Sequence, residues 1–308
     1  MFEVGDVVAG YTVDEFLGGG ATADVFRVHR GDDRPVALKV LHPKGSDPSR
    51  MRERFDREFT IARKLDHPHI VKIYARGEVD DPDTAPALRR PHYPALWMAM
   101  QYVPGSPATT LIPHDAEPDV PAILRIAAQI ASALDYAHGQ EILHRDVKPA
   151  NILTTPTSSG LDGFLSDFGI AQFLDDTRPL ARNGRVQGSI AYAAPELLQA
   201  QQLSPATDLY AFACSLVELL TGFPPYPRTT AFAITYAHIN DDPPKLTRRR
   251  RWLPSAVDSI FAKALAKSPT DRYSSCGELV EIITRLMRDV PIPDTPPHRL
   301  FGRSRTRR

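Results

Sequence analysis

The sequence predicts an α+β protein of two lobes, a small β-rich lobe followed by a larger, mainly helical lobe. The length of 308 residues corresponds to roughly two domains or lobes. Alternating apolar residues and glycine turns dominate the start of the chain, whereas apolar residues at helical spacing dominate the rest. Apolar residues make up 42% and charged residues 24%, an ordinary globular balance that excludes a wholly disordered protein.

The small lobe is predicted to cover residues 1–102. Apolar residues alternate within residues 11–41, which is typical of strands, and glycine-containing runs at residues 18–20 and 31–33 are typical of turns. Within residues 47–65 the apolar spacing changes to that of one helical stripe, so a helix is expected there.

Two more strands, at residues 71–73 and 96–103, complete the small lobe. Residues 77–95 between them are rich in proline and charge, so we expect an exposed loop rather than a packed element. A passive surface loop is favoured for this insert, and a docking site for a partner is the alternative.

The large lobe is predicted to cover residues 103–289. Helical spacing predicts four helices, at residues 123–137, 209–220, 257–265 and 278–287. The second of these is apolar on nearly every side, so we expect it to be buried. The remaining residues, 290–308, are rich in proline and then in arginine, which predicts a disordered tail.

Composition excludes several classes of protein. Basic and acidic residues both number 37, so the basic excess typical of nucleic-acid-binding proteins is missing and no nucleic-acid partner is expected. The four arginines at residues 248–251 fit a solvated basic patch.

Cys214 and Cys276 are too few for a disulfide framework and are expected to be reduced core residues. We find no membrane span and no secretory signal, so a cytoplasmic location is expected.

Three features of the small lobe point to a phosphate site. The turn at residues 18–20 is three glycines, whose backbone N–H groups approach phosphate closely, although a flexible hairpin turn is an equally good explanation. Lys39 lies at the end of a predicted apolar strand. If its ammonium group is buried there, it needs an anionic partner. The alternative is that the side chain extends to water. Glu58 lies on the apolar stripe of the predicted helix and requires a cation, for which Lys39 is a candidate.

Three motifs follow in the second half of the chain. Residues 144–151 read HRDVKPAN, residues 167–169 read DFG, and residues 194–196 read APE. A single aspartate in a loop is usually a turn former, but chance does not explain this ordered set.

On these motifs the chain resembles the eukaryotic-like serine/threonine protein kinases of bacteria, from about Tyr11 to about Leu286. The resemblance implies a bilobal protein-kinase fold. It also implies transfer of the γ-phosphoryl group of ATP, with Mg²⁺, to serine or threonine of protein substrates, including the chain itself. Lys148, two residues after Asp146, and the pair Gly188-Ser189 match the serine/threonine rather than the tyrosine kinases.

The resemblance also implies which residues bind ATP. Lys39 would hold the α- and β-phosphates and pair with Glu58, and Met100 would guard a pocket behind the adenine. Backbone groups of Gln101 and Val103 would hydrogen-bond adenine. The implied set is Leu17, Gly18, Gly20, Val25, Ala37, Lys39, Glu58, Met100, Gln101 and Val103.

The large lobe would supply the catalytic and metal-binding groups. Asp146 would accept or orient the proton of the attacking hydroxyl, and Lys148 would neutralise the γ-phosphate. Asn151 and Asp167 would bind Mg²⁺ through oxygen atoms, the ligands that this ion prefers. The implied activation and substrate-platform residues are Arg145, Thr177, Ser189, Glu196 and Arg272.

Two of these expectations concern contacts. Glu196 is expected to form a buried ion pair with Arg272 that anchors the substrate platform. Ser189 would tie the platform to Asp146, with a plain turn serine as the alternative. Asp208, which is not among the implied site residues, is expected to brace the backbone of the catalytic loop, the segment that carries the motif of residues 144–151. The alternative is that Asp208 only interacts favourably with the dipole of its own helix.

The chain departs from the family pattern in three places. Ala23 replaces the third glycine of the nucleotide loop, and Gln101 replaces the usual hinge acid. Between Phe168 and Gln187, Thr177 is the only hydroxyl side chain. The sequence therefore predicts that activation does not require phosphorylation within residues 178–187.

Two other functions stay open from the sequence. A pseudokinase that binds nucleotide or partners without transfer would not need Lys39, Asp146 and Asp167 together. A small-molecule phosphotransferase of related fold does not usually combine Lys148 with the APE motif. The sequence does not fix the physiological substrate, the activating signal or whether the protein forms a homodimer.

Overall fold

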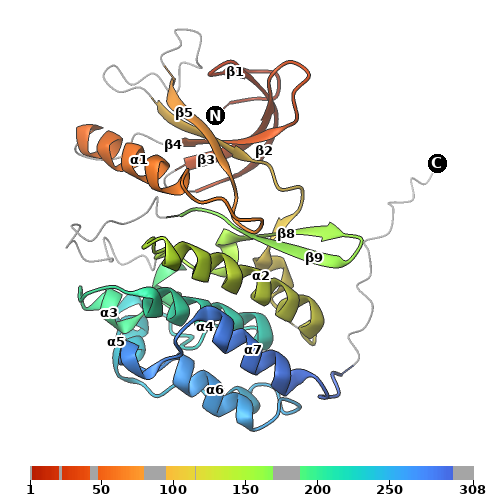
Figure 1. The fold of residues 1–308 in the computed structure, drawn as a ribbon, viewed down its shortest axis with the longest axis vertical. Coiled ribbons are helices and arrows are strands. Elements are labelled where there is room, and N and C mark those ends of the chain that lie inside the picture. The colour runs from red at the N-terminus through yellow and green to blue at the C-terminus, as the bar shows by residue number, and fades with distance from the viewer. Residues whose placement is uncertain are drawn as a thin grey trace.

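The computed structural model describes residues 2–20, 23–41, 48–79, 95–114, 116–168 and 188–293. Within these ranges, it gives the backbone alone for residues 48–51, 54, 57, 58, 188 and 189. Figure 1 shows an upper lobe of curled sheet with one long helix, α1, above a lower lobe that contains helices α2 to α7. The predicted α+β, bilobal fold is therefore confirmed.

The small lobe is built on a six-stranded antiparallel sheet in the order β1-β2-β3-β4-β6-β5. Its strands are β1 (Val7–Val8), β2 (Tyr11–Gly19), β3 (Ala23–His29), β4 (Val36–Leu41), β5 (Ile73–Val79) and β6 (Ala95–Gln101). The predicted turn at residues 31–33 joins β3 to β4. The predicted helix forms as α1 (Pro48–Ala62).

The two faces of this sheet pack differently. Leu38 of β4 packs with Phe26 of β3 on one face, whereas Ala37 packs with Phe55 of α1 on the other face. Since side chains alternate along a strand, Lys39 lies on the same face as Ala37. The side of the sheet covered by α1 therefore carries the lysine of the predicted phosphate site.

Residues 77–79 and 95, which the sequence predicts as loop, belong to strands. Gly77 and Val79 belong to β5 and pair with Trp97 and Ala95 of β6. Val79 is buried in the core of the lobe. Gly77 is required there because an added Cβ would lie 2.6 Å from the Trp97 ring. Residues 80–94 lie outside the described residues.

The large lobe combines helices with a small sheet. Its helices are α2 (Val120–Gly139), α3 (Pro195–Leu198), α4 (Pro205–Thr221), α5 (Ala231–Asn240), α6 (Ala256–Ala264) and α7 (Cys276–Met287). The sheet contains β7 (Ser106–Pro107), β8 (Ile152–Thr157) and β9 (Gly160–Leu165). Short 3₁₀ helices are η2 (Ala108–Leu111), η3 (Pro149–Asn151), η4 (Gly188–Tyr192), η5 (Leu246–Arg248) and η6 (Pro269–Asp271).

Local signals fix the ends of the two central helices. The Asp119 carboxylate accepts a hydrogen bond from the Ala122 N–H at the start of α2. Ser204 and Thr207 form a capping box at the start of α4, and Gly222 ends α4 with a φ of 89°. Helix α4 is buried along nearly its whole length, as predicted. No helix among the described residues has the length and apolar character needed to cross a lipid bilayer.

The sequence does not indicate helix α5 or the β8–β9 hairpin. Helix α5 carries apolar residues on several sides, so no single stripe marks it as amphipathic. The large lobe also extends past residue 289, because Val290 and Ile292 pack against its core. The rest of the predicted tail, residues 294–308, lies outside the described residues.

The arginine run at residues 248–251 is only in part the solvated patch that its composition suggests, since only Arg248 and Arg251 of the four are exposed. Arg249 donates hydrogen bonds to three backbone carbonyls just past the end of α4. Burial lowers the pKa of its guanidinium below the ordinary value. Arg250 pairs with Glu117 at 3.2 Å. At least two of the four arginines therefore hold parts of the large lobe together.

Candidate active site

Lys39 of β4 and Asp167, two residues after β9, form an ion pair that joins the two lobes. Lys39 Nζ donates to Asp167 Oδ1 at 2.6 Å. The Lys39 side chain is 12% exposed, so burial requires an anionic partner, which Asp167 supplies. The Asp167 side chain is 35% exposed, so one end of the pair is open to solvent. The side chain of Glu58, the partner expected for Lys39, lies outside the described residues.

A cavity lies beside this ion pair, between the lobes. It is lined by Ala62, Ile70, Val71, Ile73, Met98, Met100, Asp167 and Phe168. Met100 therefore lines a pocket next to Asp167, where the sequence expects a residue that guards the space behind adenine.

The other residues expected near adenine share one apolar cluster. Ala37, Met100 and Val103 are buried in it, and Val25 packs against it together with Leu153 of β8. The cluster therefore contains residues of both lobes, which is the composition that a flat, apolar ring bound between the lobes requires.

Gln101 ties the end of β6 to the residue that precedes β5. Its backbone N–H donates to the Lys72 carbonyl at 2.8 Å. Its Oε1 accepts a hydrogen bond from the Lys72 N–H at 3.3 Å. The glutamine that replaces the usual hinge acid thus stabilises the end of β6 against the start of β5 within the small lobe.

Two of the three glycines predicted as a turn belong to β2, which ends at Gly19. Leu17 and Gly18 belong to the strand, and the Gly20 N–H donates to the Ala23 carbonyl at 2.9 Å. The register of β2 against β3 shifts between Phe16 and Gly18, which is typical of a bent strand end. Residues 21 and 22 lie outside the described residues.

Asp146, Lys148 and Asn151 meet in the loop that leads into β8. Lys148 Nζ donates to Asp146 Oδ2 at 2.6 Å. Asn151 Nδ2 donates to the same oxygen at 3.0 Å and to the Asp146 carbonyl at 2.8 Å. The Asp146 carboxylate is therefore held by two donors at one oxygen, and Asn151 retains its amide oxygen as an acceptor.

The segment after β9 is fixed against this loop. Ser166 donates to the Asn151 carbonyl through its N–H at 2.9 Å and its hydroxyl at 3.0 Å. His144 Nε2 donates to the Ser166 carbonyl at 2.8 Å. The ring centroids of His144 and Phe168 lie 4.7 Å apart in an edge-to-face arrangement. These contacts hold Asp167 at a φ of 60°, a conformation that non-glycine residues rarely adopt.

Asp208 braces the catalytic loop, as expected. It is fully buried in the first turn of α4. Its carboxylate accepts hydrogen bonds from the backbone N–H groups of His144 (2.8 Å) and Arg145 (2.7 Å) and from His138 Nε2 (2.8 Å). Burial alone raises the pKa of Asp208, but these donors outweigh it and hold the pKa below the ordinary value. Arg145 has a φ of 67°, which this bracing maintains.

The charge of Asp167 is set by its neighbours. Burial raises the pKa of its carboxyl, and the Lys39 ammonium, assisted by His144 and Lys148, more than offsets that effect. The net pKa of Asp167 lies below its ordinary value. Asp167 is therefore an anion near neutral pH.

The donor set fits Mg²⁺. Asp167 offers carboxylate oxygens, and Asn151 offers an amide oxygen because its NH₂ group already donates to Asp146. The two residues are brought together by the hydrogen bonds between Ser166 and the Asn151 carbonyl. Oxygen atoms of this kind are the ligands that Mg²⁺ prefers.

The expected ion pair between Glu196 and Arg272 is present. Arg272 donates to both carboxylate oxygens of Glu196, at 2.7 and 2.8 Å, and both side chains are buried. Glu196 belongs to α3, and Arg272 follows η6. The side chain of Ser189 and all of Thr177 lie outside the described residues, so their expected roles stay predictions.

Sequence reasoning misses several polar residues of this region. His144 donates to the Ser166 carbonyl and His138 donates to Asp208, but a histidine carries no periodic signal. Tyr192, after the region of Ser189, donates to the Glu218 carboxylate at 2.5 Å. Burial raises the pKa of the Glu218 carboxyl above its ordinary value, and the hydrogen bond from Tyr192 offsets part of that effect.

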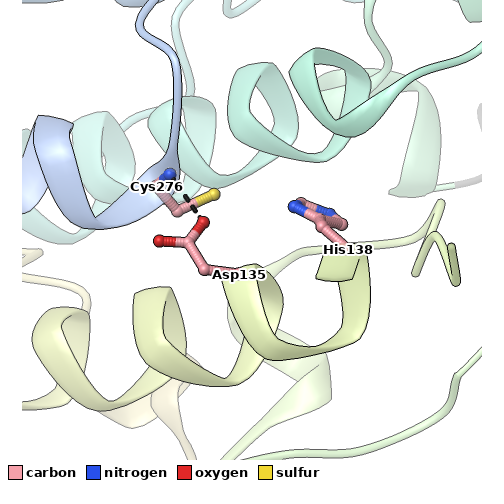
Figure 2. A group of neighbouring side chains, drawn as sticks. All are labelled: Asp135, His138 and Cys276. Carbon is pink, nitrogen blue, oxygen red and sulfur yellow. Dashed lines mark hydrogen bonds between the residues drawn. The ribbon is translucent and has the colours of Figure 1, made fainter. Parts of the chain in front are cut away.

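A second group of potential ligands lies between α2 and α7. Figure 2 shows Asp135, His138 and Cys276, whose ligand atoms lie within 4.8 Å of one another. The Asp135 carboxylate accepts hydrogen bonds from the N–H groups of Cys276 (2.9 Å) and Gly277 (2.8 Å) at the start of α7. His138 is bonded to Asp208, and burial raises the pKa of the Cys276 thiol. This group therefore joins helices, and Cys276 is the buried, reduced cysteine that the sequence predicts.

Comparison with known proteins agrees with this geometry. The family model of the protein kinase domain matches residues 11–284. The chain is 37% identical over 295 residues to the serine/threonine-protein kinase PknF of Mycobacterium tuberculosis, which covers 94% of this chain and 59% of PknF. It is also 37% identical over 303 residues to PknJ of the same organism, covering 96% of this chain and 49% of PknJ. The chain thus spans about half the length of these curated relatives.

A solved structure resembles the fold. The crystal structure of the Mycobacterium tuberculosis PknI kinase domain matches with a TM-score of 0.70 and 34% sequence identity. The match covers 93% of this chain and 100% of the solved chain. The two lobes described above are therefore the lobes of a known fold.

Proposed function

Because the chain belongs to the protein kinase family, we propose that it transfers the γ-phosphoryl group of ATP to serine or threonine hydroxyls of proteins, its own among them. One observation carries the proposal. The cluster of Asp146, Lys148 and Asn151 is hydrogen-bonded to the segment that holds Asp167, and Asp167 pairs with Lys39 beside the cavity. The serine/threonine specificity is supported by the names of the relatives PknF and PknJ.

In this proposal the nucleotide binds between the lobes. The apolar cluster around Ala37 and Met100 receives adenine, and Lys39 holds the phosphates from the small lobe. Asp167 and Asn151 hold Mg²⁺, which supplies positive charge against the phosphate oxygens when bound. Lys39 is bonded to Asp167, one of the proposed metal ligands, so both positive charges would act on the phosphates from the same place.

Asp146 is the group that meets the attacking hydroxyl. Its carboxylate accepts the hydroxyl hydrogen bond and takes the proton as the oxygen forms its bond to the γ-phosphorus. The bond between the γ-phosphorus and the bridging oxygen breaks, and ADP leaves with that electron pair. Lys148, bonded to Asp146 at 2.6 Å, neutralises charge on the phosphoryl oxygens.

The same proposal covers location and partners. ATP as the phosphoryl donor requires a compartment that contains ATP, so we expect the active site to work in the cytoplasm. Proteins that carry serine or threonine are the substrates, and a homodimer stays an open prediction.

The experiment is a transfer assay with ATP labelled on its γ-phosphate, Mg²⁺ and a generic basic protein. We expect labelled phosphoserine or phosphothreonine in the protein. Asp146→Asn should lower turnover by at least about 10³-fold while nucleotide still raises the unfolding midpoint. Asp32→Asn, the same change in the exposed turn between β3 and β4, is the matched control and should keep full turnover.

Two outcomes would overturn the proposal. Nucleotide binding without transfer by the unchanged protein would identify a binding scaffold instead. Transfer to a small alcohol but not to protein would identify a small-molecule phosphotransferase.

A further inference from the structure

Helix α5 has an outer face that is exposed to solvent and an inner face that is buried. Phe232 is 80% exposed and Tyr236 is 55% exposed on the outer face. On the inner face Ile234, Ala237 and His238 are buried, and His238 is fully inaccessible to solvent. A fully buried histidine must find partners for both ring nitrogens, so its contacts are informative.

Both ring nitrogens of His238 have partners. Nε2 lies 3.1 Å from the Ala191 carbonyl, and Nδ1 lies 2.9 Å from the Tyr210 hydroxyl. A carbonyl only accepts, so Nε2 carries the hydrogen and Nδ1 accepts from Tyr210. Burial, assisted by the Lys267 ammonium, lowers the pKa of His238 to about 4. The ring is therefore neutral near pH 7 and keeps one tautomer.

The carbonyl that His238 holds belongs to η4, just before the APE motif. Ala191 lies in η4, and Glu196 in α3 follows five residues later. Glu196 is fixed by Arg272, whose guanidinium lies 4.8 Å from the centre of the Tyr210 ring. The two ends of this segment are thus tied to the same buried residue, Tyr210, one through His238 and the other through Arg272.

Lys267 fixes helix α5 in the position that this contact requires. Its ammonium donates to the carbonyls of Ala237 (3.2 Å) and His238 (2.7 Å) at the end of α5. It also donates to the Tyr226 hydroxyl at 3.0 Å. Because Lys267 satisfies the last carbonyls of the helix, α5 ends at a defined point with the His238 ring turned towards Ala191.

We propose that His238 is a positioning residue for the protein substrate. By holding the Ala191 carbonyl it keeps η4 and the residues before α3 in the shape that receives the substrate chain beside the phosphorylated hydroxyl. This inference rests on the proposed function, and it assigns to α5 a role in substrate binding rather than in nucleotide binding or phosphoryl transfer.

The proposal predicts a split between kinetic constants. His238→Phe keeps an aromatic ring at this position but removes both hydrogen bonds, so the KM for a protein substrate should rise about five- to tenfold. The kcat and the KM for ATP should stay within about twofold, because Lys39 and Asp146 lie on other elements. His238→Gln places an amide N–H near the Ala191 carbonyl and should restore the KM to within about twofold.

Two further variants guard against a purely structural explanation. Tyr210→Phe removes the donor to Nδ1 together with the contact of the same hydroxyl with Tyr226, and the KM for protein should rise about two- to threefold. Tyr273→Phe removes another buried tyrosine hydroxyl, 3.4 Å from the Ile260 carbonyl, and should leave the KM for protein unchanged. Thermal unfolding establishes that each variant is folded, and Tyr210→Phe carries the test if His238→Phe does not fold.

The outcomes separate the two proposals. If the unchanged protein transfers no phosphate, the proposed function fails and this inference with it. If the unchanged protein is active, an unaltered protein KM in the folded His238 and Tyr210 variants overturns the positioning role alone. An equal loss in kcat and in ATP binding would also overturn it, since that pattern indicates general damage.

Discussion

Two long-range ion pairs, Lys39–Asp167 and Glu196–Arg272, differ in how much water reaches them. Arg272 and Glu196 are at most 1% exposed and meet through two hydrogen bonds. Lys39 and Asp167 meet through one hydrogen bond, and Asp167 is 35% exposed beside a cavity. The first pair has its charges fully satisfied by protein, whereas the second leaves a carboxylate exposed, which binds Mg²⁺ in the proposed function. Two ion pairs of the same kind therefore differ in role: the buried pair stabilises the fold, and the exposed pair takes part in ligand binding in the proposed function.

The largest expected effect is on catalysis at the exposed pair. Lys39→Met should lower turnover by about 10³- to 10⁴-fold, because the phosphates lose their cation from the small lobe. The free energy of unfolding should change by only about 1 kcal/mol, since a partly exposed pair contributes little. Turnover and chemical denaturation measure the two quantities, with Lys64→Met at an exposed position as the control.

Breaking the buried pair should mainly lower the stability of the protein. Arg272→Met leaves the Glu196 carboxylate buried without its partner and should lower the free energy of unfolding by about 3–5 kcal/mol. Denaturant unfolding measures this loss. Arg285→Met removes a partner of Glu281 on the surface and should change stability by less than about 0.5 kcal/mol. A small loss in the Arg272 variant would mean that the two pairs do not differ as argued.

A smaller effect is expected at Asp208, which is buried like Glu196 but serves the catalytic loop. Asp208→Asn should lower the free energy of unfolding by about 2 kcal/mol at pH 7, because two backbone N–H groups and His138 lose a charged acceptor. The folded pKa of Asp208 lies below the unfolded one, near 3.8. Its stabilisation is therefore complete above that pH and disappears as the pH falls through the folded pKa.

Acid unfolding curves test this assignment. The unchanged protein should lose stability on acidification below about pH 4 more steeply than Asp208→Asn. Asp271→Asn, the same change at an exposed residue, should keep the slope of the unchanged protein. Identical acid slopes in all three proteins would show that Asp208 is not a source of the pH dependence.

Periodicity and motif order predict most of the architecture and the candidate site. The nearly continuous apolar run of α4 predicts a buried helix. Apolar residues at helical spacing predict four other helices, α1, α2, α6 and α7. Helix α5 escapes prediction because its apolar residues do not fall on one side. The arginine run misleads because composition cannot show that Arg249 caps the carbonyls after α4. Such contacts depend on residues distant in sequence, and no local pattern encodes them.

The sequence by itself determined the two lobes, the position of Lys39 in an apolar strand and the order of the three motifs, because these depend on local periodicity and residue type. Only the tertiary structure decided which charges meet. It pairs Lys39 with Asp167 across 128 positions and turns His238 towards Ala191. Hydrogen bonds act over about 3 Å, so partners far apart in the chain are chosen by how helices and strands pack.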